Sequence, residues 1–254
     1  MHSLDSIKGI RLYQRKDGYR FSVDALLLFS FINLQRVKRI VDIGAGSGVI
    51  GLLLAKKYRQ SEVALLELQE SLARLAERNV TLNNLEQRVR VMKINASKIG
   101  NSNDPKRVKP PVRSHTPLPT LREIDPFDLA VSNPPFRKVN TGRLNAVDER
   151  TLARHEVMLS LEELACTSSF LLRHHGRLCI IHLPERLAEI VGILRERLLE
   201  PKRLRFVHSK PSTEAKMVLI EAVKGGKMGL TVERPLFIYK EDGSYTDELN
   251  AIYA

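Results

Sequence analysis

The sequence is poor in the residues and runs that mark secreted, metal-binding or membrane proteins. It has 2 cysteines, Cys166 and Cys179, and no Cys-x-x-Cys pair. Both lie among apolar residues, which predicts reduced thiols in the core rather than a disulfide or a zinc site. The longest apolar stretches, 25–32 and 161–172, contain polar residues and fall short of the ~18–20 residues of a membrane span. The N-terminus shows no signal-peptide pattern, so we expect a cytoplasmic protein.

Acidic residues are also scarce relative to basic ones. The chain has 41 Lys and Arg against 29 Asp and Glu, a net charge of +12. This excess favours a polyanionic partner, and without membrane signals that partner is expected to be a nucleic acid. A basic enzyme without such a partner is the alternative that charge alone leaves open. Otherwise the composition, 43% apolar and 28% charged, is that of a folded soluble domain.

Strand-like and helix-like patterns alternate along the chain. The strand-like runs are 39–43, 62–66, 89–94, 127–131, 176–183, 204–208 and 218–223. The helix-like stretches are 49–58, 69–83, 159–173 and 184–199. This alternation predicts an α/β fold, with a mostly parallel sheet, helices on both faces and an antiparallel pair of C-terminal strands. We expect one domain over residues 1–254.

One stretch departs from this pattern. Residues 100–122 hold five of the 12 prolines together with Lys106, Arg107 and Lys109. Strand-like runs lie on both sides, which predicts a basic, proline-rich loop insertion over residues 100–124 rather than a linker between domains. We expect these three side chains to hold RNA phosphates, although a solvated face explains each charge singly.

Closely spaced glycines follow the first strand-like run. The turn Gly44-Ala45-Gly46-Ser47-Gly48 leads from Asp42 in that strand into a helix, and such glycines let a ligand approach the backbone. Val49 stands where the dinucleotide-binding fingerprint requires its third glycine, so a diphosphate cofactor is disfavoured. Glu67 follows the second strand, where a carboxylate can accept hydrogen bonds from both hydroxyls of a ribose.

Asp42, the glycine turn and Glu67 together resemble the class I methyltransferases that bind S-adenosylmethionine. By this resemblance the cofactor-binding residues are Asp42, Gly44, Ala45, Gly46, Gly48 and Glu67. Asn95 follows the third strand, where that superfamily often has an Asp facing the adenine amine, and an amide oxygen can accept the same hydrogen bond. A turn with a solvated glutamate is the structural alternative.

The tetrapeptide Asn133-Pro134-Pro135-Phe136 follows the fourth strand-like run. Its two prolines restrict the backbone and remove two N–H donors, which leaves the Asn side-chain oxygen and a Pro carbonyl as a pair of acceptors for an NH₂ group. Phe136 offers a face on which a planar base can stack. The motif resembles that of methyltransferases acting on adenine, on guanine or on protein glutamine, and by itself does not choose among them.

Four further segments narrow the choice. They are residues 16–27, 153–156, 203–208 and 245–246. In this order they resemble the bacterial family of valine-tRNA adenosine-37 N6-methyltransferases. The resemblance implies a class I, Rossmann-like fold with a seven-stranded sheet, S-adenosylmethionine as cofactor and tRNA as partner.

The same resemblance assigns roles to individual residues. Asn133, Pro134, Pro135 and Phe136 would be catalytic, with Asn133 also contacting the cofactor. Residues 1–36, Asp24 among them, would close over the cofactor, although Asp24 also suits the first turn of a helix. The predicted RNA contacts outside the insertion are Phe136, Lys138, Arg143, Arg154, Arg203 and Arg205.

Several alternatives stay open at this point. The amine acceptor could belong to a guanine, to another adenine of RNA or DNA, or to a protein glutamine. A protein of another class, a non-catalytic RNA-binding module with the same fold, is also possible, but the intact cofactor and amine motifs argue against it. We expect no metal and no membrane contact, and a monomer is the default oligomeric state.

Overall fold

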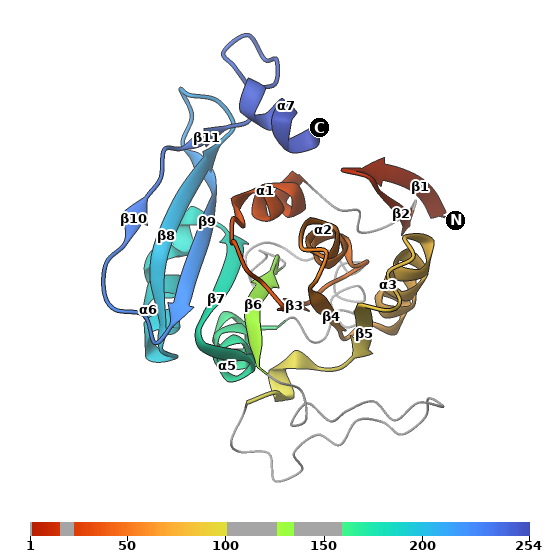
Figure 1. Cartoon of the computed structure of the whole chain (residues 1–254). Coiled ribbons are helices and arrows are strands. Elements are labelled where there is room, and N and C mark those ends of the chain that lie inside the picture. Colours follow the sequence, from red (N-terminus) through yellow and green to blue (C-terminus); the bar gives the residue numbers. More distant parts are fainter. Residues whose placement is uncertain (1, 16–22, 101–125, 135–158) are drawn as a thin grey trace, which may run out of the picture.

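Strands from both halves of the chain lie side by side in one sheet (Figure 1). The described residues give this sheet nine strands. Its order is β10-β8-β9-β7-β6-β3-β4-β5, and β11 pairs with β8. The strands are β3 (Arg39–Ile43), β4 (Glu62–Glu67), β5 (Val89–Lys93), β6 (Phe127–Ser132), β7 (Leu172–His182), β8 (Leu199–His208), β9 (Ala215–Lys224), β10 (Thr231–Val232) and β11 (Leu236–Phe237). This computed structural model describes residues 2–15, 23–100, 126–134 and 159–254.

The predicted strand directions are confirmed. Neighbouring strands are parallel from β5 through β4, β3 and β6 to β7, whereas β9 is antiparallel to both β7 and β8. The sheet has nine strands rather than the predicted seven, because β10 and β11 pair with β8. Each of these two strands has two residues, too few to show a period in the sequence.

Helices cover both faces of the sheet (Figure 1). One face carries α1 (Val23–Phe31), α2 (Val49–Lys57) and α3 (Glu70–Leu82). The other carries α5 (Leu161–Leu171) and α6 (Leu187–Glu196), with the short 3₁₀ helices η1 (Ala96–Lys98) and η2 (Pro184–Arg186) in the adjoining connections. The buried apolar residues accordingly form two clusters, one on each side of the sheet.

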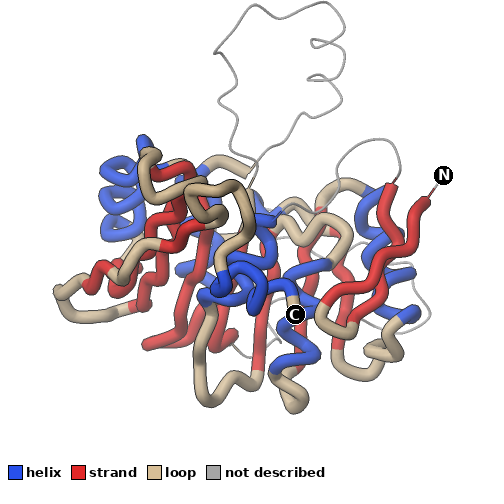
Figure 2. The backbone as a smooth tube through the Cα atoms, turned by 90° about the horizontal axis from the view of Figure 1, so that it is seen from above, coloured by secondary structure: helices blue, strands red, loops and turns tan. Residues whose placement is uncertain are grey.

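A second layer lies outside α1, α2 and α3. It consists of the antiparallel hairpin β1 (His2–Ile7) and β2 (Ile10–Arg15) and of the C-terminal helix α7 (Asp247–Tyr253). Figure 2 shows these elements from above, in front of the strands of the sheet. Among the described residues, no helix combines the length and the apolar character needed to cross a membrane.

The predicted elements follow from local chemistry. The middle of the sheet is covered on both faces, so β3 and β6 are buried at nearly every position rather than at alternate ones. Helix α5 begins where Ser160 and Glu163 form a reciprocal capping box. Both cysteines are free thiols as predicted, with Cys179 buried and Cys166 half-buried.

Candidate active site

Three sequence motifs meet at one edge of the sheet. The register of β3 with its two neighbours places Gly44, Glu67 and Asn133 at the same level, at the carboxyl ends of adjacent parallel strands. The Ser132 hydroxyl donates to the Ile43 carbonyl at 2.7 Å and so joins two of these strand ends. The chain crosses here from β5 to β6, on the other side of β3. This is the topological switch point at which α/β sheets bind ligands.

The glycine turn between β3 and α2 needs its glycines for two reasons. Gly44, Gly46 and Gly48 all have left-handed backbones, with φ of 74°, 58° and 87°. A Cβ on Gly48 would lie 3.0 Å from Leu65 Cδ1, whereas a Cβ on Gly44 or Gly46 would meet no described heavy atom within 4 Å. The first two glycines therefore leave room for a ligand against the backbone, and the third lets the turn pack on the sheet.

Glu67 holds this turn in place. Its side chain is buried, with Oε2 accepting from the Gly46 N–H at 2.8 Å and Oε1 from the Gln69 N–H at 2.7 Å. Each carboxylate oxygen has a second lone pair, so the same group can also accept ribose hydroxyls. The predicted ribose contact is compatible with this geometry and stays a prediction.

Asp42 has a structural contact that the motif did not suggest. It is 1% exposed, and its Oδ2 accepts from the Gly51 N–H of α2 at 2.9 Å. Burial, together with the nearby Glu67 and against the lowering effect of the Gly51 N–H, raises the pKa of Asp42 to about 7. Asp42 therefore ties the strand to the helix that the glycine turn begins. Its contact with a cofactor stays a prediction.

Asn133 and Pro134 are half-buried at the end of β6. Within the described part of the chain, the Asn133 carboxamide makes no hydrogen bond, so its oxygen is available to a ligand amine. Several other predicted site residues lie outside the described residues. They are Pro135, Phe136, Lys106, Arg107, Lys109, Lys138, Arg143 and Arg154.

Asn95 lies after β5, as predicted, and its side chain caps η1. Its Oδ1 accepts from the Ser97 N–H at 3.0 Å and from the Ser97 hydroxyl at 2.8 Å. Both lone pairs of the amide oxygen are thus used locally. An adenine amine would have to replace one of these bonds, and the predicted contact stays a prediction.

Asp24 lies in the first turn of α1, close to helix α7. Burial raises the pKa of Tyr253 in α7, and neighbouring tyrosines and Asp24 also raise it. The other end of α7 is held by Arg205, whose Nη2 lies 2.7 Å from Glu248 Oε1. The structure thus gives Arg205 an intramolecular partner, and its predicted RNA contact stays a prediction.

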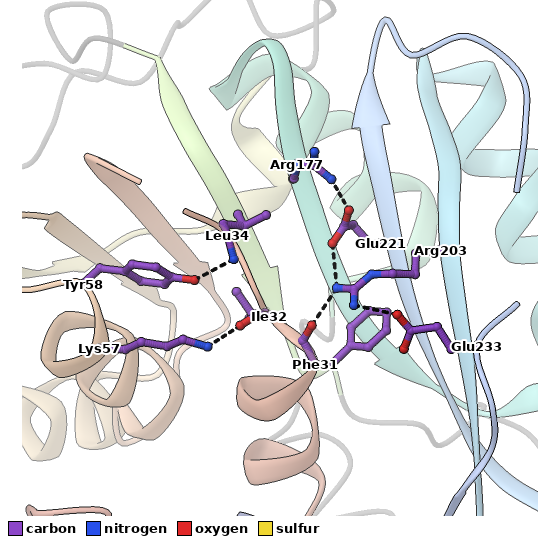
Figure 3. Close-up of polar contacts among 9 residues, drawn as sticks. All are labelled: Phe31, Ile32, Leu34, Lys57, Tyr58, Arg177, Arg203, Glu221 and Glu233. Atoms are coloured by element: carbon purple, nitrogen blue, oxygen red, sulfur yellow. Dashed lines mark hydrogen bonds and ion pairs between the residues drawn. The ribbon is translucent and has the colours of Figure 1, made fainter. Parts of the chain in front are cut away.

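Arg203 joins α1 to the C-terminal strands (Figure 3). Its Nη2 donates to the Phe31 carbonyl at 2.6 Å and to Glu221 Oε2 at 2.8 Å, and its Nη1 donates to Glu233 at 2.9 Å. The guanidinium carbon lies 3.9 Å from the centre of the Phe31 ring. Glu221 is 3% exposed and is also paired with Arg177. Arg203 is therefore a partner of a buried carboxylate, and its RNA contact stays a prediction.

Asn79 is a site-supporting residue that the motifs did not reveal. It is fully buried in α3, where its Oδ1 accepts from the Tyr13 N–H at 2.7 Å. Its Nδ2 donates to the Ser47 carbonyl at 3.0 Å, in the glycine turn, and to the Tyr13 carbonyl at 3.2 Å. The sequence contained one signal for this role, which is that Asn79 is a polar residue on the apolar face of an amphipathic helix.

Comparisons with known proteins agree with this geometry. A family model described as methyltransferase small domain matches residues 20–118. A tRNA1(Val) (adenine(37)-N6)-methyltransferase from Porphyromonas gingivalis is 34% identical over 221 residues, covering 85% of this chain and 79% of the relative. A protein of the same name from Parabacteroides distasonis is 26% identical over 241 residues, covering 92% of each chain.

Solved structures show the same fold. A predicted O-methyltransferase from Agrobacterium tumefaciens aligns with a TM-score of 0.66 at 22% identity, covering 91% of this chain and 95% of the other. The Thermus thermophilus 16S rRNA N2 G1207 methyltransferase, solved with AdoMet and guanosine, aligns with a TM-score of 0.54 at 16% identity, covering 88% of this chain and 50% of the other. The predicted class I methyltransferase fold is confirmed.

Proposed function

The chain belongs to the family of tRNA1(Val) (adenine(37)-N6)-methyltransferases, and from this we propose that it methylates the N6 amine of adenosine 37 in a valine tRNA, with S-adenosylmethionine as methyl donor. The observation that carries the proposal is the single row formed by the open glycine turn, Glu67 and Asn133, whose amide bonds to none of the described residues, at the switch point of the sheet.

The residues at this edge fit the cofactor. The open backbone at Gly44 and Gly46 can lie directly against a ligand, and Glu67 offers carboxylate lone pairs beside them. When bound, S-adenosylmethionine supplies an electrophilic methyl group on its sulfonium. Asp42, Ala45, Gly48, Asn95, Asn133 and Asp24 remain in the proposed cofactor site on the strength of the sequence.

Asn133 and Pro134 would position the amine. The Asn133 side-chain oxygen and the Pro134 carbonyl each accept one N–H of the adenine N6 amine, which leaves the nitrogen lone pair directed away from both acceptors. Positioning of this kind needs no strong base, because the proton can leave after the methyl group has transferred. Pro135 would help to fix the loop, and Phe136 would stack on the base.

The RNA itself would be held by positive charge. The net charge of +12 favours a polyanion, and a base in an anticodon loop is flipped out more easily than one in a duplex. The proposal keeps Lys106, Arg107, Lys109, Lys138, Arg143 and Arg154 as phosphate contacts. It also keeps residues 1–36 as the segment that closes over the cofactor, and the cytoplasm as the place of reaction.

The direct test is methylation of a defined RNA. The purified protein is incubated with labelled S-adenosylmethionine and a valine tRNA carrying A37 or G37, and the RNA is digested to nucleosides for mass spectrometry. We expect label in N6-methyladenosine with the A37 tRNA alone. Label in methylguanosine, in a protein glutamine or in no substrate would contradict the proposal.

Substitution of Asn133 separates chemistry from cofactor binding. Asn133→Ala removes one amine acceptor, and we expect turnover to fall by about 100-fold because the amine is no longer aligned. The affinity for S-adenosylmethionine, measured by calorimetry, should stay close to that of the wild type. Asn250→Ala, an exposed amide on α7, is the matched control and should change neither quantity. Full activity of Asn133→Ala would refute its role.

A further inference from the structure

A pocket of about 580 Å³ opens at the amino-terminal ends of the central parallel strands. The proposed active site lies at their carboxyl ends. The pocket is lined by the loop before β3 and by the amino-terminal parts of β6 and β7, together with β8 and β9. Asp128 at the start of β6 lines it, whereas Asn133 follows the end of the same strand. At about 3.3 Å per residue, the two lie roughly 16 Å apart along the strand. The pocket is therefore separate from the methyl-transfer site.

Positive side chains converge on this pocket. Four arginines from the loop before β3, from β7 and from β8 line it, and the exposed His175 joins them. The arginines are Arg36, Arg173, Arg177 and Arg203. Against these four charges stand two carboxylates, Asp128 and Glu221. The lining therefore carries a net positive charge even with His175 neutral.

Both carboxylates are already engaged by the protein. Asp128 Oδ2 accepts from the N–H groups of Lys38 and Arg39 at 2.7 Å and 2.9 Å, and its Oδ1 accepts from Arg173 Nε at 2.5 Å. Glu221 is paired with two of the arginines, as described above for Arg203 (Figure 3). These bonds hold the guanidinium groups of Arg173, Arg177 and Arg203 in place before any ligand arrives, which lowers the entropy cost of binding.

Hydrogen-bond donors remain in excess. A guanidinium has five N–H donors. Among the described residues, Arg36 donates to no partner, Arg177 donates through Nη1 alone, and Arg173 uses Nε and Nη1. The two carboxylates do not have enough lone pairs to match the four arginines. A ligand for this pocket must therefore bring several acceptor oxygens and negative charge.

The lining also limits what kind of anion fits. Of the described residues that line the pocket, Leu34 is the one apolar side chain, and none is a Phe, Tyr or Trp on which a nucleobase could stack. Arginine forks match the oxygens of a phosphate with paired hydrogen bonds. We propose that this pocket binds phosphate groups, either of inorganic polyphosphate or of an RNA backbone, without reading a base.

The test uses tripolyphosphate and variants that leave the buried ion pairs intact. Arg36→Gln removes an exposed, unpaired charge, and His175→Asn keeps a residue that tolerates the left-handed backbone found there, with φ of 61°. We expect the double variant to bind tripolyphosphate about tenfold more weakly by calorimetry, because the guanidinium charge with its paired N–H groups and the imidazole are lost. Arg90→Gln, an exposed arginine on the edge strand β5, is the charge-matched control and should bind like the wild type.

Two results would overturn the site. One is a wild type that does not bind tripolyphosphate. The other is an Arg90→Gln variant that loses as much affinity as the double variant, since this would mean diffuse attraction to a basic surface. Unchanged melting temperatures of the variants exclude unfolding as the cause of a loss.

A second measurement identifies the source of the phosphate. If the pocket holds the RNA backbone, the double variant binds valine tRNA more weakly and tripolyphosphate competes with tRNA for the wild type. If it holds a small polyphosphate, tRNA binding and methylation by the double variant match the wild type. Both results retain the pocket. Because tripolyphosphate binding is measured without methyl transfer, its outcome is independent of the proposed function.

Discussion

Asp42, in the strand that leads into the glycine turn, has a raised pKa. Its ordinary pKa of 3.8 rises to about 7 because the carboxyl is buried and lies near Glu67. The unfolded chain therefore releases this proton at lower pH than the folded chain does. Between these two values the folded state binds more protons, so the free energy of unfolding falls as pH rises through this window.

Asp42→Asn should remove this pH dependence while keeping an oxygen for the Gly51 N–H. We expect the variant to gain stability relative to the wild type as pH rises from about 4 to about 7, by at most about 1.4 kcal/mol per pH unit. Urea unfolding at several pH values measures the difference. Hydrogen bonds from Arg173 and two backbone N–H groups outweigh burial and lower the pKa of Asp128, so Asp128→Asn should show no such trend in this range. A pH-independent difference for Asp42→Asn would contradict the assignment.

Helix α3 connects the N-terminal hairpin to the glycine turn through one side chain. Asn79 and Asn83 both accept from β2 backbone N–H groups, at 2.7 Å and 2.8 Å, but only Asn79 also donates to Ser47 in the turn. The hairpin is therefore coupled to the proposed cofactor site through Asn79. Asn83, at the C-cap of the same helix, is a natural control.

We expect Asn79→Ala and Asn83→Ala both to speed amide hydrogen exchange in β2, because each loses a bond to that strand. Only Asn79→Ala should also weaken the binding of S-adenosylmethionine, because it alone leaves the Ser47 carbonyl without its partner. Hydrogen exchange and calorimetry report the two effects separately. Equal cofactor affinities in the two variants would show that Asn79 supports the hairpin alone.

Helix α1 is fastened at its C-terminal end by the buried pair of Arg203 and Glu221. Arg203→Met leaves the nearly inaccessible Glu221 carboxylate with Arg177 as its one remaining cation among the described residues, and we expect a loss of about 1.5–3 kcal/mol in the free energy of unfolding. Arg195 and Glu200 form an ion pair whose arginine is half-exposed. Arg195→Met should therefore cost less than about 1 kcal/mol. Urea titration compares the two, and equal losses would refute the special role of the buried pair.

The whole molecule is strongly basic, and the residues 106–113 carry four of its positive charges and no negative one. If they contact RNA, their deletion weakens tRNA binding and makes the plot of log affinity against log salt less steep by up to about 3. Cofactor affinity should not change. An unaltered tRNA affinity with an unaltered salt slope would show that these charges do not contact RNA.

Much of the candidate site could be predicted because its signals are local. A glycine turn, a carboxylate after the second strand and an Asn-Pro pair after the fourth are each contiguous in sequence. In a parallel sheet the carboxyl ends of the strands lie on the same side of the sheet. Because β6, β3 and β4 are neighbours, Gly44, Glu67 and Asn133 lie next to one another there. The two-residue strands β10 and β11 carry no such signal, and the predicted strand count was therefore too low.

The sequence by itself determined the alternation of strands and helices, the cofactor-type turn and the amine-acceptor motif, because these depend on residue type and short-range spacing. Only the tertiary structure decided which charges are buried and which groups they meet. Arg203 reads as a surface cation in the sequence, yet in the fold it is bonded to Phe31 and Glu221. Asp42 likewise accepts a hydrogen bond from α2, and Asn79 bonds to β2 and to the glycine turn. The physical reason is that desolvation and hydrogen-bond partners are set by packing between segments far apart in the chain.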